Sequence, residues 1–193
     1  MDSVCIFCGS SNGSHSDHAE AARSVGRLLA ERGLQMVYGG GRVGLMGEAA
    51  DAALEAGGEV IGVIPEDLRR KEISHTGLTK LHVVGSMHER KALMADLSDG
   101  FIALPGGYGT LEEFVEVLSW AQLSIHEKPC ALLNVNGFYD SLSTFFDGAV
   151  EEGFVHPDHR SLVLMEKNPQ MLLDRMACYT PPETKKWIDP RKL

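Results

Sequence analysis

Apolar residues along the 193-residue chain fall into short runs that alternate with amphipathic segments. The runs are rich in Val, Ile and Leu and are bounded by glycine, proline or polar residues, which is typical of buried strands. Between them, apolar side chains recur every three or four positions, as on one face of a helix. In residues 18–32 this face carries Ala22, Val25 and Leu29. Gly33 follows where such a helix would end.

The pattern therefore predicts strands and helices in strict alternation. Strands are expected at residues 3–8, 34–38, 59–64, 81–84, 101–104, 130–135 and 161–165. Helices are expected at residues 18–32, from the glycine-rich stretch 39–44 to about 56, and at 86–97, 110–125, 138–152 and 168–178. Residues 66–79 are polar and are expected to be irregular.

Nearly continuous apolar strands separated by helices indicate a parallel sheet that is covered on both faces. We therefore predict an α/β fold with a single doubly wound, Rossmann-like parallel sheet. One domain is expected over residues 1–180, with a tail at 181–193. Ligands of such folds bind beyond the carboxyl ends of the strands. That rule selects four loops, which are residues 9–17, 39–46, 85–91 and 105–113.

The charge and hydropathy of the chain limit its partners. The net charge is −9, and no long basic run is present. This argues against a nucleic acid or an acidic membrane surface as partner, so any phosphate must be held by local groups. No apolar run reaches the roughly 18 residues of a membrane span. The chain begins without a secretion signal, so we expect a cytoplasmic protein.

The cysteines and histidines do not predict a metal or redox site. Cys5 and Cys8 have C-x-x-C spacing, but they lie inside an apolar strand rather than at a helix N-terminus. Reduced thiols are the better interpretation. His156 and His159 have a spacing near that of metal ligands, but no third ligand is evident nearby. We expect no metal.

Residues 39–44, GGGRVG, contain the G-x-G-x-x-G pattern between a strand and a helix. One interpretation is contact with a phosphate or nucleotide, which would involve Gly41 and Arg42. A second is a tight turn that packs the helix closely. An NAD site is the weakest interpretation, because the motif follows the second strand rather than the first. Glu59, the acidic residue about 20 positions on, also falls at the start of the next strand.

Residues 105–113, PGGYGTLEE, lie between a predicted strand and a predicted helix. Gly106, Gly107 and Gly109 allow backbone N–H groups to converge on one point, and the helix adds its positive end. This nest suits a phosphate, with the Thr110 hydroxyl as an extra donor. The alternative is a capping box, in which Thr110 is the N-cap and Glu113 bonds back to it. A capping box alone does not require three glycines.

The stretch SMHERK at residues 86–91 opens another predicted helix. Arg90 and Lys91 could bring cationic donors to the same edge of the sheet. Taken alone, this stretch is also typical of an ordinary solvated helix turn.

Together these stretches resemble the LONELY GUY (LOG) family, the cytokinin riboside 5′-monophosphate phosphoribohydrolases. The family's hallmark is P-G-G-x-G-T-x-x-E, which matches residues 105–113. SMHERKALM (86–94), WAQLSIHEKP (120–129), LLNVNGFYD (132–140) and GGGRVGLMG (39–47) are also similar. The resemblance covers about residues 3–165. Members are often labelled lysine decarboxylase-like, but nothing in this sequence indicates a pyridoxal-phosphate site.

The resemblance implies a hydrolase that cleaves the N-glycosidic bond of N6-substituted adenosine 5′-monophosphates without a cofactor. It also implies at least a homodimer, with helices 86–97 and 110–125 as candidate contacts. The implied catalytic residues are Glu113 and Arg90. Glu113 would face the ribose, and Arg90 would orient Glu113 and the oxygens of the substrate. The predicted substrate site comprises Gly41, Arg42, Glu72, Met87, Lys91, Gly106, Gly107, Tyr108, Gly109, Thr110, Leu111, Glu112 and Ser119.

Three rival functions remain open at this point. A neighbouring family on a similar fold carries molybdenum cofactor without hydrolysing it. A general nucleosidase for AMP would need the same catalytic pair. An NAD-dependent dehydrogenase is the most distant of the three.

Overall fold

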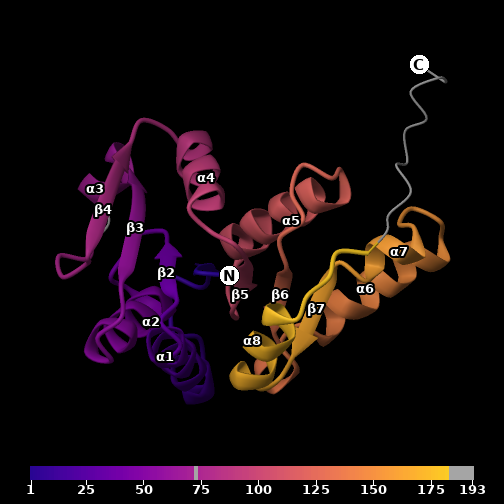
Figure 1. The fold of residues 1–193 in the computed structure, drawn as a ribbon, viewed down its shortest axis with the longest axis horizontal. Helices are drawn as coiled ribbons and strands as arrows, with labels where there is room; N and C mark the ends of the chain where they lie inside the picture. The colour runs from indigo at the N-terminus through magenta and orange to yellow at the C-terminus, as the bar shows by residue number, and fades with distance from the viewer. Residues whose placement is uncertain (72–73, 183–193) are drawn as a thin grey trace.

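The computed structural model describes residues 1–71 and 74–182. Their seven strands form one parallel sheet in the order β4-β3-β2-β1-β5-β6-β7 (Figure 1). The strands are β1 (Ser3–Phe7), β2 (Gln35–Tyr38), β3 (Val60–Pro65), β4 (Lys80–Val84), β5 (Phe101–Ala103), β6 (Cys130–Leu133) and β7 (Val163–Glu166).

Helices cover both faces of this sheet (Figure 1). Those of the described residues are α1 (Ser16–Glu31), α2 (Gly44–Glu55), α3 (Glu66–Lys71), α4 (Met87–Asp96), α5 (Tyr108–Gln122), α6 (Asp140–Glu151), α7 (Pro157–Arg160) and α8 (Pro169–Ala177), with a short 3₁₀ turn η1 (Val135–Gly137). Apolar side chains of α1, α2 and α8 form one hydrophobic cluster with the strands. Those of α4, α5 and α6 pack in a second cluster on the opposite face. The predicted doubly wound parallel sheet is confirmed.

Two local predictions were wrong. Residues 66–71 of the segment expected to be irregular form the short helix α3. The stretch around His156 and His159, which was not among the predicted helices, contains the four-residue helix α7. Both helices are shorter than the window over which a helical period can be recognised. None of the helices in the described residues is long and apolar enough to cross a membrane.

The strand order places the topological switch between β1 and β5. From β1 the chain builds outward through β2, β3 and β4, and then returns to add β5 on the other side. The loops after these two strands meet there, since Gly9 N–H donates to the Pro105 carbonyl at 3.0 Å. Ligands of doubly wound sheets bind at this crevice. The fold therefore brings the loops at 9–17 and 105–113 together.

The glycine-rich stretch 39–44 has a packing role in this arrangement. Gly44 has φ +60°, a left-handed conformation that favours glycine. A Cβ there would lie 2.3 Å from the backbone of Ser10 and Ser11. Leu45 N–H then donates to the Gly9 carbonyl at 3.0 Å. The turn thus seats α2 directly on the loop after β1, as the packing interpretation of this motif requires.

Candidate active site

Two adjoining cavities lie at the switch point. The first, of about 280 Å³, contains Arg90 and Glu113 and is called the Glu113 cavity below. The second, of about 340 Å³, contains His18 and is called the His18 cavity. Both are lined by Gly9, Ser10 and Gly107. Together they form one continuous crevice of the size that small-molecule sites commonly have.

Arg90 and Glu113 form a buried ion pair in the Glu113 cavity. Arg90 lies in the first turn of α4, which Ser86 caps by accepting from Glu89 N–H at 3.2 Å. Glu113 lies in the second turn of α5. The Arg90 Nη2 to Glu113 Oε1 distance is 2.9 Å, and the side chains are 12% and 11% exposed. Two helices that begin at the same edge of the sheet thus join the two residues implied to be catalytic.

The environment raises the pKa of the Glu113 carboxyl above its usual range. Burial is the largest cause, because it disfavours the charged form. The Arg90 guanidinium opposes this by favouring the carboxylate, while Glu112 adds to the increase. A carboxyl group with a raised pKa and a cationic neighbour is suited to proton transfer.

The position of Arg90 is fixed by close neighbours. A Cβ at Gly39, the residue that follows β2, would lie 2.2 Å from Arg90 Nη2. Nη1 of Arg90 contacts the Met87 sulfur at 3.8 Å. Nε of Arg90 is buried and meets no acceptor among the described residues. Since buried donors are usually paired, this N–H is available to an acceptor that is not part of the described chain.

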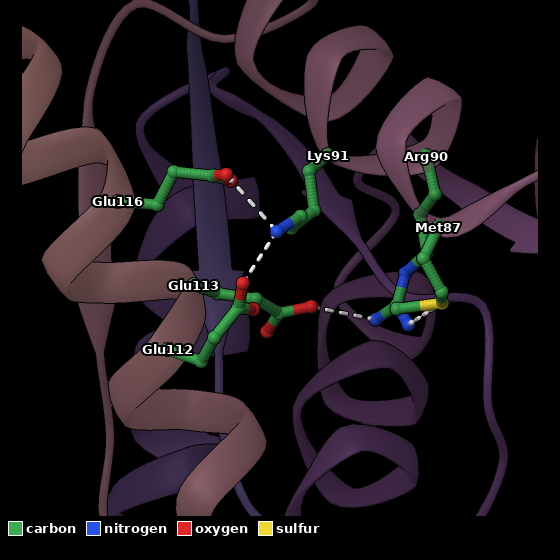
Figure 2. Close-up of polar contacts among 6 residues, drawn as sticks. All are labelled: Met87, Arg90, Lys91, Glu112, Glu113 and Glu116. Atoms are coloured by element: carbon green, nitrogen blue, oxygen red, sulfur yellow. Dashed lines mark hydrogen bonds and ion pairs between the residues drawn. The ribbon is translucent and has the colours of Figure 1, made fainter.

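Lys91 is held apart from this pair (Figure 2). Its ammonium group bonds Glu112 and also Glu116, the latter at 3.0 Å. The hydrogen bond to Glu112 is the largest cause of the raised pKa of Lys91. Figure 2 shows Lys91 with Glu112 and Glu116 next to the Arg90–Glu113 pair, where the cations of α4 meet the carboxylates of α5. Lys91 is therefore neutralised by carboxylates within the chain.

The turn before α5 leaves a row of free donors. The N-cap is Gly107, which has no capping side chain, and Thr110 lies inside the helix. The capping box, which was the alternative interpretation of this motif, does not form, because Glu113 pairs with Arg90 instead. The first backbone bond of the helix runs from Leu111 N–H to the Gly107 carbonyl. Among the described residues, no backbone acceptor meets the N–H groups at positions 106–110. Such a turn is suited to an anion.

The cavities contain some of the predicted site residues and not others. Besides Arg90 and Glu113, the Glu113 cavity is lined by Met87, Gly107, Tyr108, Gly109, Thr110 and Glu112. Gly106 lines the His18 cavity.

The remaining predicted residues lie elsewhere. Ser119 donates its hydroxyl to the Val115 carbonyl within α5. Leu111 packs partly buried against the core. Gly41 is buried and pairs with Ser74 in an isolated bridge, whereas Arg42 is exposed. Neither these four nor Lys91 lines either cavity. Glu72 lies outside the described residues.

The Glu113 cavity also includes residues that the motifs did not single out, namely Cys8, Gly9, Ser10 and Met46. Cys8, Gly9 and Ser10 follow β1. The loop at residues 9–17 was predicted to lie near a ligand because it follows the carboxyl end of this strand, but no residue within it was chosen, and Cys8 was assigned to the strand. The four cysteines are free thiols, and burial raises the pKa of Cys5 and Cys8 well above its usual range. No group of three His, Cys, Asp or Glu residues within 1–71 and 74–182 is placed to hold a metal ion.

Solved structures confirm the fold. The chain superposes on the molybdenum cofactor carrier protein of Chlamydomonas reinhardtii with a TM-score of 0.70 and 22% identity, over 92% of this chain and 98% of that one. A molybdenum cofactor binding protein of Rippkaea orientalis gives a TM-score of 0.70 and 22% identity, over 91% and 95% of the two chains. Fold and crevice together define a doubly wound α/β protein with a candidate ligand site at its switch point.

Sequence relatives define the family. A family model described as "Possible lysine decarboxylase" matches residues 46–176. The chain is 52% identical to the probable cytokinin riboside 5′-monophosphate phosphoribohydrolase LOGL9 of Oryza sativa subsp. japonica, over 92% of this chain and 78% of that protein. It is 50% identical to the cytokinin riboside 5′-monophosphate phosphoribohydrolase LOG5 of Arabidopsis thaliana, over the same shares of the two chains. The chain belongs to the LOG family of phosphoribohydrolases.

Proposed function

We propose that the protein hydrolyses the N-glycosidic bond of N6-substituted adenosine 5′-monophosphates, releasing a free cytokinin base and ribose 5-phosphate. The names of its relatives support the substrate class. The observation that carries the reaction type is the buried Arg90–Glu113 pair beside a turn of unpaired N–H groups. We place this activity in one domain of residues 1–180; of the predicted tail, residues 183–193 lie outside the described residues.

The two ends of such a substrate match the two parts of the crevice. The N–H groups at 106–110 and the positive end of α5 hold the phosphate, with the buried Thr110 beside them. Glu113 does not face that anion, because its carboxylate is bonded to Arg90. It faces the ribose instead. The turn therefore fixes the nucleotide at one end while the carboxylate acts at C1′.

Glu113 acts on the charge that develops during cleavage. As the bond between C1′ and the base nitrogen breaks, positive charge builds on the ribose, as in other glycoside hydrolyses. The Glu113 carboxylate stabilises this charge and orients the attacking water. Water supplies a hydroxyl to C1′ and a proton to the departing base, so no cofactor is required. Arg90 keeps Glu113 ionised and oriented and offers its buried Nε–H to a substrate oxygen.

The carrier function is less well supported. The two molybdenum cofactor proteins share the fold at 22% identity, and at that level the fold is all that is shared. A carrier has no need of a buried carboxylate paired with a guanidinium. A general AMP nucleosidase would use the same pair, so only base preference distinguishes it from the proposed function.

Product analysis tests the proposal directly. Purified protein is incubated with isopentenyladenosine 5′-monophosphate, with the corresponding riboside and with AMP, and released bases are separated by chromatography. We expect isopentenyladenine from the monophosphate and none from the riboside, because the riboside lacks the phosphate. Equal or faster release of adenine from AMP would identify a general nucleosidase. No base from any substrate would contradict the hydrolase.

Gly109→Ala should separate binding from folding. A Cβ at Gly109 meets nothing within 4 Å, so the glycine is not required by packing. Alanine in a helix is favoured over glycine by about 0.5–1 kcal/mol, so the melting temperature should rise slightly. Gly109 lines the Glu113 cavity, and we expect the added methyl to crowd a nucleotide bound over the turn. The KM for the monophosphate should therefore rise about tenfold, the order expected when one hydrogen bond to a charged group is lost.

Gly148→Ala is the matched control for this change. Gly148 lies within α6, away from both cavities, and a Cβ there also meets nothing within 4 Å. The control should gain similar stability with an unchanged KM. A Gly109→Ala protein with a normal KM would argue against a ligand over the glycine turn.

Homodimer formation remains a prediction, and exposed apolar residues on α5 and just after it support it. Val115, Leu123 and Ile125 are 41%, 61% and 65% exposed. Tyr108, at the start of the same helix, is 94% exposed beside the Glu113 cavity. A contact there would bring a second copy close to the site. Cytoplasmic location also remains a prediction.

A further inference from the structure

The His18 cavity is not explained by the catalytic pair. It lies between the loop after β1, the start of α1, and the Gly106–Gly107 turn. Its lining contains no carboxylate and no Lys or Arg side chain. A cavity next to a reaction site, with a separate polar lining, is a candidate for another part of the substrate.

His18 is the unusual residue of this cavity. It is only 7% exposed, and its ring is held by edge-on contacts with His15 and Phe138, at centroid distances of 5.7 and 5.9 Å. No hydrogen bond joins its ring nitrogens to any group within the described residues. The ring forms part of the cavity wall, and its nitrogens are not among the fully buried unpaired atoms of the described residues, so they can be reached from the cavity. Its partner is therefore expected to be a bound ligand.

The rest of the wall is rich in donors. Within the part of the chain that the structure describes, the backbone N–H groups of residues 10–12 and 14 meet no backbone acceptor. Ser10, Ser11 and Ser14 add hydroxyl groups. On the facing side are the unpaired N–H groups of Gly106 and Gly107. Donors from two loops with no opposing carboxylate form a wall that suits an oxyanion with several acceptor atoms.

The position of this cavity relative to Glu113 identifies the oxyanion. Gly107 and Ser10 line both cavities, so a ligand whose reacting carbon lies near Glu113 can extend across the turn to His18. We propose that the His18 cavity is the subsite for the 5′-phosphate of the substrate, and that the His18 ring binds a phosphate oxygen directly. The identity of the ligand rests on the proposed function. The base then lies on the opposite side, toward Met46 and Met87.

Two substitutions of His18 test this subsite. His18→Phe keeps a ring against Phe138 but removes both nitrogens, whereas His18→Gln keeps a donor. For His18→Phe we expect the KM for isopentenyladenosine 5′-monophosphate to rise about tenfold with kcat nearly unchanged, as for loss of a hydrogen bond to a charged group. Inhibition by inorganic phosphate should weaken by a similar factor. His18→Gln should recover part of both losses.

The outcomes separate the subsite from the proposed function. If the wild-type protein cleaves the nucleotide but phosphate inhibition is the same in His18→Phe, the subsite is overturned and the hydrolase stands. If the wild-type protein cleaves nothing, calorimetric titration with inorganic phosphate still decides. If inorganic phosphate binds the wild-type protein more tightly than it binds His18→Phe, the subsite is supported. If it binds both proteins equally, the subsite is overturned. A third outcome would also overturn the phosphate subsite. If His18→Phe changed the preference between the isopentenyl-substituted and the unsubstituted base but left phosphate inhibition unchanged, the base would be the part of the substrate that lies in the His18 cavity.

A further measurement covers the case in which His18→Phe does not fold. Ser10 is exposed and lines both cavities, so Ser10→Ala should fold normally. It should raise the KM and weaken phosphate inhibition together, though less than His18→Phe. Nuclear magnetic resonance offers a second test. The imidazole nitrogen resonances that are present in the wild-type protein and absent from His18→Gln belong to His18, and inorganic phosphate should shift them in the wild-type protein. Absence of both effects would overturn the subsite.

Discussion

Glu113→Gln is expected to lower kcat about a thousandfold, the size of effect seen when a catalytic carboxylate or a key electrostatic stabiliser is lost. Glutamine has nearly the same shape and still offers an oxygen to Arg90, so the buried pair at 2.9 Å can keep its geometry. It carries no charge to stabilise the ribose cation and cannot accept a proton from water. Ribose 5-phosphate should still bind with unchanged affinity, because the phosphate contacts are intact.

The measurement is single-turnover release of base, together with calorimetric titration of ribose 5-phosphate. Glu116→Gln is the matched control, because Glu116 lies one turn further along α5 and, among the described residues, pairs with Lys91. Lys91 also keeps its bond to Glu112 in that variant. The control should retain nearly full activity. A Glu113→Gln enzyme with normal kcat would exclude the carboxylate from the chemistry.

The second large effect is expected when the guanidinium of Arg90 is removed. Burial raises the pKa of Glu113 and Arg90 opposes that rise. The reaction needs the carboxylate, so activity is present above the raised pKa and is lost as the pH falls through it. In Arg90→Met, burial acts unopposed and the pKa rises further. The acidic limb of the kcat/KM profile should therefore move to higher pH by about one unit or more.

At neutral pH we expect kcat/KM of Arg90→Met to fall about hundredfold, because less carboxylate is present and its orientation is lost. Gly39→Ala should produce the same change in weaker form without altering either catalytic residue. Its φ is not in the positive region, so alanine is allowed, but the new Cβ would lie 2.2 Å from Arg90 Nη2 and would displace the guanidinium.

The pH–rate profiles of both variants check this prediction, with Arg23→Met as the control. Arg23 pairs with Glu48 on the α1–α2 side of the sheet, at a partly exposed site. Its removal should leave the acidic limb in place. If Arg90→Met and Gly39→Ala left that limb unmoved, Arg90 would not control the ionisation of Glu113.

The sequence by itself determined the fold class and the edge of the sheet at which the site lies. Alternating apolar runs and helical periods require a parallel sheet covered on both faces, because that arrangement buries both kinds of apolar surface. Glycine after β5 and cationic residues after β4 then have to meet at the carboxyl edge. The resemblance carried by PGGYGTLEE added the chemistry, and the relatives confirmed the family.

Only the tertiary structure decided which side chains meet there. Thr110 and Glu113 have the spacing of a capping box, yet Glu113 turns to Arg90 on a different helix. Lys91 looked as available as Arg90, but two carboxylates of α5 hold it. His18 belongs to none of the motifs that the sequence analysis singled out. Its burial beside Phe138 depends on packing between segments far apart in the chain, which local sequence patterns do not contain.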